Sequence, residues 1–122
     1  MRRKILCVDD EIQILNILSR LLESEGFEVK KAINADEFQK TAPEFQPDLI
    51  ILDIMLGDKN GVQVYDDLIA KGFDKKVPVI FLSGLVQESM KSPASPGRTY
   101  ALLAKPFKHD ELIRQINTLL GA

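Results

Sequence analysis

Acidic side chains stand directly after two apolar runs of this chain. Asp9 and Asp10 follow residues 5–8, and Asp53 follows residues 49–52. Carboxylate oxygens are the ligands that hard divalent cations prefer, so these acids suit Mg²⁺, with Mn²⁺ as an alternative. One carboxylate can also attack phosphorus as a nucleophile and form an acyl phosphate. The three acids therefore predict a cation site with phosphoryl-transfer chemistry.

A hydroxyl and a lysine stand after two further apolar runs. Ser83 follows residues 79–82, and Lys105 follows residues 100–104 and precedes Pro106. A lysine neutralises charge on transferring phosphoryl oxygens, and a hydroxyl can donate a hydrogen bond to one of them. The Lys-Pro bond is a candidate for the cis form, which only X-Pro pairs adopt at low cost. That geometry would aim the lysine inward.

The segments between these residues alternate between strand-like and helix-like patterns. We predict strands at about 5–8, 27–32, 48–52, 78–82 and 99–104. We predict helices at about 11–25, 34–42, 62–70 and 109–120, and a short one at 85–91. Pro43 is placed beyond the second helix, and residues 57–61 are predicted to form a loop. Pro93 and Pro96 predict a loop after the short helix.

Five strand-helix pairs predict an α/β fold, with a doubly wound parallel sheet between helices. In such sheets the carboxyl ends of the strands meet at one edge, so the polar residues should converge there. The 122 residues suit one domain, 1–122. Their net charge of -2 predicts no direct binding to nucleic acid. No apolar stretch reaches the ~20 residues that span a bilayer, so we expect no membrane association and a cytoplasmic protein.

Each residue also has a simpler explanation when taken alone. Asp9 and Asp10 could cap a helix, and Asp53 could cap a loop. Ser83 could bond its own backbone in a turn. Glu11 is interpreted as a charge in the first turn of a helix. The convergence of all the strand-end residues favours the functional interpretation.

These motifs, taken in chain order, resemble the receiver domain of two-component response regulators. The resemblance rests on Asp9-Asp10, Asp53, Gly61, Ser83 and Lys105-Pro106-Phe107, and it covers essentially the whole chain. It implies a (βα)5 flavodoxin-like three-layer sandwich with the sheet order 2-1-3-4-5. It also implies a signalling protein that is not a metabolic enzyme.

The resemblance implies a role for each site residue. Asp53 matches the aspartate that a partner histidine kinase phosphorylates. Asp10 matches a direct magnesium ligand, Asp9 a ligand that acts through water, and the backbone carbonyl of Met55 the third protein ligand beside Asp53. The hydroxyl that follows the phosphoryl group and the lysine that pairs with it match Ser83 and Lys105.

The resemblance also implies the partners. A sensor histidine kinase or phosphotransfer protein would donate the phosphoryl group, and an unidentified downstream protein would receive the signal. A phosphorylation-dependent dimer would use the face of the fourth helix, the fifth strand and the fifth helix. A stand-alone protein and a piece of a longer regulator or hybrid kinase both remain open.

Several positions depart from the family's pattern. Leu102 stands where the switch aromatic is usual, and Tyr100 lies two residues earlier. Gly57 stands where proline is common, and Pro93 and Pro96 fall where the fourth helix is usually longer. The phosphorylation site is therefore complete by its residue types, whereas the surface that would report phosphorylation is unusual.

Three other functions fit parts of the pattern. A degenerate receiver would act as a phosphate-independent interaction module, but the complete set of acids, hydroxyl and lysine argues against it. A phosphatase with an aspartyl-phosphate intermediate commonly carries a second acid two residues after the nucleophile, where this chain has Met55. A flavodoxin-like cofactor binder needs a phosphate-binding loop after the first strand, where Asp9 and Asp10 would repel the phosphate.

Overall fold

The computed structural model describes residues 2–84 and 100–121 of the chain. Five parallel strands form its central sheet in the order β2-β1-β3-β6-β7. The strands are β1 (Lys4–Val8), β2 (Glu28–Ala32), β3 (Leu49–Asp53), β6 (Val79–Ser83) and β7 (Tyr100–Ala104). Because β6 and β7 are the fourth and fifth predicted strands, the predicted order 2-1-3-4-5 is confirmed.

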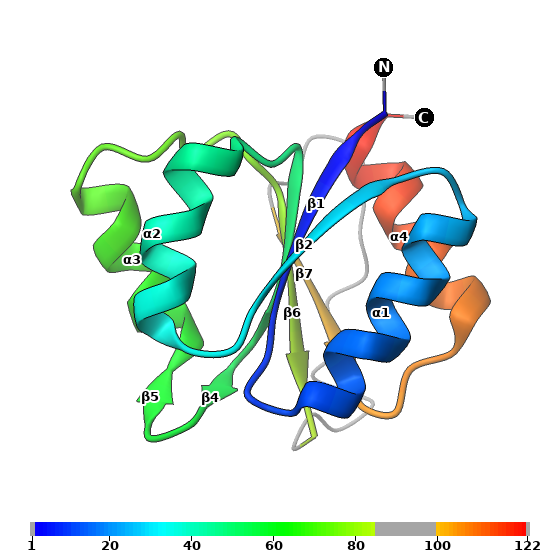
Figure 1. The fold of residues 1–122 in the computed structure, drawn as a ribbon, viewed down its shortest axis with the longest axis horizontal. Coiled ribbons are helices and arrows are strands. Elements are labelled where there is room, and N and C mark those ends of the chain that lie inside the picture. The colour runs from blue at the N-terminus through cyan, green and yellow to red at the C-terminus, as the bar shows by residue number, and fades with distance from the viewer. Residues whose placement is uncertain (1, 85–99, 122) are drawn as a thin grey trace.

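Helices cover both faces of the sheet (Figure 1). One face carries α1 (Ile12–Ser24) and α4 (His109–Leu120), and the other carries α2 (Ala35–Phe45) and α3 (Gly61–Ala70). This is the predicted flavodoxin-like three-layer sandwich. The short helix predicted at 85–91, with Pro93 and Pro96, lies outside the described residues. None of the described helices has the length and apolar character needed to cross a membrane.

The core has two parts because the inner strands β1, β3 and β6 bury residues on both faces of the sheet. Leu6 and Val8 pack with Phe38 on the α2–α3 face, whereas Ile5 and Cys7 pack with α1 and α4. All residues of β3 and β6 are buried, as expected for inner strands of a parallel sheet. Packing on both faces of the sheet thus holds the strand ends in place.

Helix α2 is longer than the sequence predicted. It continues through Pro43 to Phe45, and Gln46 ends it in the left-handed conformation at φ 53°. The missing N–H of Pro43 removes one intrahelical hydrogen bond. Ala42 and Phe45 are buried in the core, and this packing outweighs that loss. The prediction of a helix end at 42 was therefore wrong.

A small antiparallel hairpin replaces most of the loop predicted at 57–61. Strands β4 (Met55–Leu56) and β5 (Lys59–Asn60) pair through a two-residue connection. Gly57 has φ 64°, and glycine at the first position of such a connection is typical of a type II′ hairpin. The Gly-Asp pair at 57–58 was the sequence signal for this turn.

Candidate functional site

The predicted site residues lie at the carboxyl ends of four neighbouring strands. Asp9 and Asp10 follow β1, and Asp53 is the last residue of β3. Ser83 ends β6, and Lys105 follows β7. The Lys105-Pro106 bond is cis, as the sequence suggested. The parallel sheet therefore brings all five residues to one edge, as predicted.

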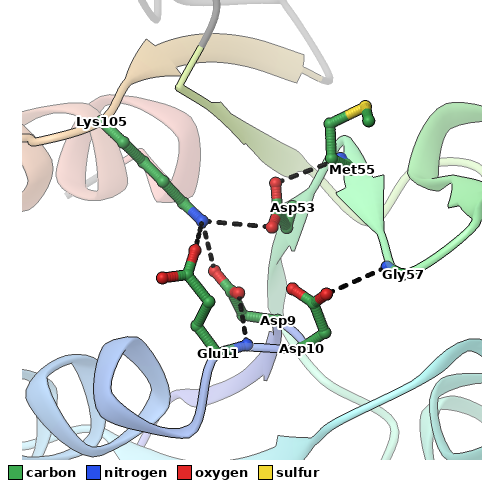
Figure 2. Close-up of polar contacts among 7 residues, drawn as sticks. All are labelled: Asp9, Asp10, Glu11, Asp53, Met55, Gly57 and Lys105. Atoms are coloured by element: carbon green, nitrogen blue, oxygen red, sulfur yellow. Dashed lines mark hydrogen bonds and ion pairs between the residues drawn. The ribbon is translucent and has the colours of Figure 1, made fainter.

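The ammonium group of Lys105 lies among three carboxylates (Figure 2). Its Nζ is 2.8 Å from Asp9 Oδ2, 3.1 Å from Asp53 Oδ2 and 3.3 Å from Glu11 Oε1. Burial opposes the charged form of Lys105, but the hydrogen bonds and charges of Asp9 and Asp53 outweigh it. They raise the pKa of Lys105 above its ordinary value. The lysine is therefore charged and pointed at the strand-end acids.

Asp9 is completely buried. Its Oδ1 accepts a hydrogen bond of 2.9 Å from the backbone N–H of Glu11. Apart from the ion pair with Lys105, its Oδ2 has no hydrogen-bond partner among the described residues. Burial raises the pKa of Asp9 to about 6, although Lys105 and the Glu11 amide act in the opposite direction. A further positive charge at the site would thus stabilise the ionised form of Asp9.

Asp53 is 3% exposed, and both oxygens of its carboxylate are held. Oδ1 accepts a hydrogen bond of 3.1 Å from Met55 N, and Oδ2 contacts Lys105. Gly61 packs directly beneath, where its N–H donates to Ile54 O at 2.6 Å. A Cβ at position 61 would overlap with the carbonyl oxygen of Asp53. This close approach explains the glycine eight residues after Asp53.

Four acids at this edge could hold a cation together. One carboxylate oxygen from each of Asp9, Asp10, Glu11 and Asp53 lies within 4.8 Å of the others. Hard oxygen ligands in a partly open site suit Mg²⁺, which keeps several waters of its own. Like charges this close raise one another's cost of ionisation, and a cation removes that conflict. The donor set therefore fits the predicted ion.

Glu11 differs from its interpretation as a first-turn helix charge. It is the N-cap residue of α1, and its side chain makes no capping hydrogen bond there. It reaches Lys105 instead. The sequence signal was the uninterrupted run of three acids, because a residue next to two strand-end aspartates stays close to their site.

Ser83 is buried, and its carbonyl oxygen accepts a hydrogen bond of 2.9 Å from Lys105 N. The Met55 side chain lies on the surface beside the site. Further along the sheet, the half-buried Leu102 lines a hollow of about 540 Å³ with Tyr100 and Tyr65. Tyr100, two residues before Leu102, is half exposed and lines the same hollow.

Residues 5–117 match the family model of the response regulator receiver domain. The chain belongs to this family. The receiver domain is 32% identical over 117 residues to the DNA-binding dual master transcriptional regulator RpaA of Synechocystis. It shares 32% identity over 117 residues with the transcriptional regulatory protein ResD of Bacillus subtilis. Each match covers 96% of this chain and 48% of the relative, so the chain spans about half the length of these proteins.

Solved structures show the same fold. The Vibrio cholerae chemotaxis protein CheY4 superposes with a TM-score of 0.82 at 24% identity, over 98% of this chain and 99% of that one. The receiver domain of the hybrid histidine kinase CckA gives a TM-score of 0.79 at 27% identity, over 96% and 98% of the two chains. The receiver fold thus extends over almost the whole chain.

Proposed function

We propose that this receiver domain accepts a phosphoryl group on Asp53 from a phosphohistidine and signals through contacts with other proteins. One arrangement carries the proposal: Asp53 ends a buried strand with its Oδ2 at 3.1 Å from the Lys105 ammonium, beside three further acids. A nucleophile, a positive charge and a set of cation ligands are the three parts that phosphoryl transfer to a carboxylate requires.

Asp53 is the nucleophile in this mechanism. A lone pair of its carboxylate attacks the phosphorus, and a P–O bond forms. The P–N bond to the donor imidazole breaks, its electron pair returns to the ring nitrogen, and that nitrogen takes up a proton. The product is an acyl phosphate. Water later attacks the phosphorus, the P–O bond to Asp53 breaks, and inorganic phosphate leaves.

The neighbours of Asp53 stabilise the charge that moves onto the phosphoryl oxygens. Lys105 provides an ammonium group that is already oriented by Asp9 and Asp53. The Ser83 hydroxyl is assigned as a hydrogen-bond donor to the phosphoryl group. These groups are fixed by buried strand ends, so little reorganisation is needed during transfer.

We assign a Mg²⁺ site, with Mn²⁺ as an alternative ion, to Asp9, Asp10, Asp53 and the backbone carbonyl of Met55. Asp10 and Asp53 would hold the ion directly, and Asp9 would act through water. When bound, the ion neutralises charge on the transferring oxygens. The oxygen donors within 4.8 Å of one another support this assignment.

Membership of the receiver family supports a proposal for the partners. The phosphoryl donor is a sensor histidine kinase or a phosphotransfer protein, and the recipient of the signal is a downstream protein. Residues 1–122 act as one cytoplasmic receiver domain, without direct contact to nucleic acid or membrane. A phosphorylated dimer would use the surface that includes β7 and α4.

Intact mass spectrometry after incubation with acetyl phosphate and Mg²⁺ tests the proposal. We expect the wild-type chain to gain one phosphoryl group and Asp53→Asn to gain none. Chelation of the metal with EDTA should prevent the gain in the wild type. If the wild type gains nothing, the chain is a degenerate receiver, and the proposed phosphorylation is wrong.

A further inference from the structure

Asp10 differs from the other aspartates of the site in how it is held. Asp9 and Asp53 are buried and paired with Lys105, whereas Asp10 is exposed. Among the described residues, its side chain accepts one hydrogen bond, which Gly57 N donates to Oδ2 at 3.2 Å. An exposed aspartate without such a bond samples several rotamers in water. The backbone of Gly57 is therefore what orients this carboxylate.

The hairpin that carries Gly57 is itself firmly anchored. Leu56 is 3% exposed and packs in the core beneath the hairpin. At its far end, the side chain of Asn60 accepts hydrogen bonds from the first backbone amides of α3, at 2.8 Å from Val62 N and 3.3 Å from Gln63 N. At its near end, Met55 N donates to Asp53. The Gly57 amide is thus presented from a fixed element.

The hydrogen bond to Asp10 depends on the type of residue at position 57. Gly57 has φ 64°, in the left-handed region that favours glycine, and it has a backbone N–H. Proline, which is common at this position in receiver domains, has no N–H and fixes φ near about −65°. A chain with proline here could not form this bond.

We propose that Gly57 is a positioning residue for the cation site and that its amide makes the β4–β5 hairpin part of that site. The inference rests on the proposed role of Asp10 as a cation ligand. One oxygen of Asp10 accepts the Gly57 N–H, while the other lies on the side of Asp9 and Asp53 (Figure 2). Asp10 therefore loses little rotational freedom when a cation binds.

Titration calorimetry with MgCl₂, without any phosphoryl donor, tests the role of the amide. Gly57→Asn and Gly57→Ala keep the N–H but share the backbone strain of a side chain at φ 64°, so they are the controls for strain, and we expect both to bind Mg²⁺ more tightly than Gly57→Pro. Gly57→Pro removes the N–H, and we expect about tenfold weaker binding, which corresponds to one hydrogen bond to a charged group. Wild-type affinity in Gly57→Pro would contradict the proposal. An equal loss in Gly57→Ala would also contradict it, because backbone strain would then be the cause.

Amide hydrogen exchange of the wild-type chain gives a second test that needs no variant. We expect the Gly57 amide to exchange severalfold more slowly with MgCl₂ than with EDTA, and the amide of the exposed residue Asp58 to serve as the unchanged reference. Equal Gly57 exchange in both buffers would overturn the proposal. If the wild type binds Mg²⁺ and takes up the phosphoryl group, and Gly57→Pro binds Mg²⁺ equally well, only the proposal for Gly57 is wrong. A wild type that binds no Mg²⁺ defeats both proposals.

Discussion

Lys105 supplies one ammonium group to three carboxylates, so the residues of this site are oriented but not neutralised. Four acids lie together at this edge, and each adds to the cost of ionising the others. Burial raises the pKa of Asp9 to about 6, and the nearby charge of Asp53 acts in the same direction. At the scale of single residues, the excess of negative charge at the site is thus the reason to expect a cation there.

Asp9 should make the stability of the metal-free protein depend on pH. Its pKa in the folded state, about 6, is above the ordinary value of 3.8. Between these values the folded protein binds more protons than the unfolded chain, so the contribution of Asp9 to stability falls as pH rises. In EDTA at about pH 8, we expect Asp9→Asn to be more stable than the wild type by about 2 kcal/mol.

Urea unfolding of both proteins across this pH range measures the effect. The difference in unfolding free energy should be nearly constant above the folded-state pKa of about 6, and it should shrink as the pH falls from there toward about 4. A difference that does not shrink over that lower range would mean that the charge of Asp9 is not its cause.

Met55 should give the phosphorylated protein a long lifetime. Its side chain lies beside Asp53 and is 54% exposed, but a thioether cannot orient an attacking water as an amide can. We expect slow release of phosphate from the wild type and a severalfold faster release from Met55→Asn. The decay of the phosphorylated mass after removal of acetyl phosphate measures both rates. A wild type that already loses phosphate as fast as Met55→Asn would refute the expectation.

The hairpin β4–β5 shows how a short element decides the geometry of a site. It connects β3 to α3, and its amides hold two of the site's carboxylates, those of Asp53 and Asp10. It closes against the end of β3 because Gly61 has no side chain. At the scale of elements, therefore, the hairpin is a structural part of the site.

Gly61→Ala should destabilise the protein because its Cβ would overlap with the carbonyl of Asp53. Backbone atoms on both sides would have to move, and we expect a loss of about 2 kcal/mol in the free energy of unfolding. The matched control is Gly84→Ala, where a Cβ meets no atom of the described residues within 4 Å. Chemical denaturation of both variants measures the difference. Equal stability of the two variants would show that the hairpin can shift without cost.

The elements also show where sequence patterns were sufficient to predict secondary structure and where they were not. The apolar runs of β1, β3 and β6 predicted buried inner strands, since such runs suit a sheet covered on both faces. Pro43 was taken as a helix end because proline lacks a donor, but the burial of Phe45 extends the helix beyond it. Local propensity thus failed where a tertiary contact outweighed it.

At the scale of the whole molecule, two helical layers hold four strand ends in register. The contacts of the site therefore join residues far apart in the chain: 52 positions separate Lys105 from Asp53, and 94 separate it from Glu11. A ligand held by residues so far apart in the chain binds the folded protein and not the unfolded chain. Such a ligand therefore stabilises the whole fold.

Mg²⁺ should accordingly raise the melting temperature of the protein. At a concentration about 100 times its dissociation constant, the ion adds about 2.7 kcal/mol to the folded state, which corresponds to a rise of several degrees. Differential scanning calorimetry with MgCl₂ and with EDTA measures the rise. NaCl at equal ionic strength is the control for screening, and Asp10→Ala is the control for the site. A rise of the same size with NaCl would exclude a specific cation effect.

The sequence by itself determined the fold class, the strand order through its family resemblance, and which residue types stand at the strand ends. These features depend on local patterns of apolar and polar residues, which one chain displays directly. Only the tertiary structure decided that Glu11 reaches Lys105, that Gly57 holds Asp10 and that Gly61 lies beneath Asp53. Those contacts depend on where side chains and backbone amides point after distant segments pack, and a linear pattern does not contain these directions.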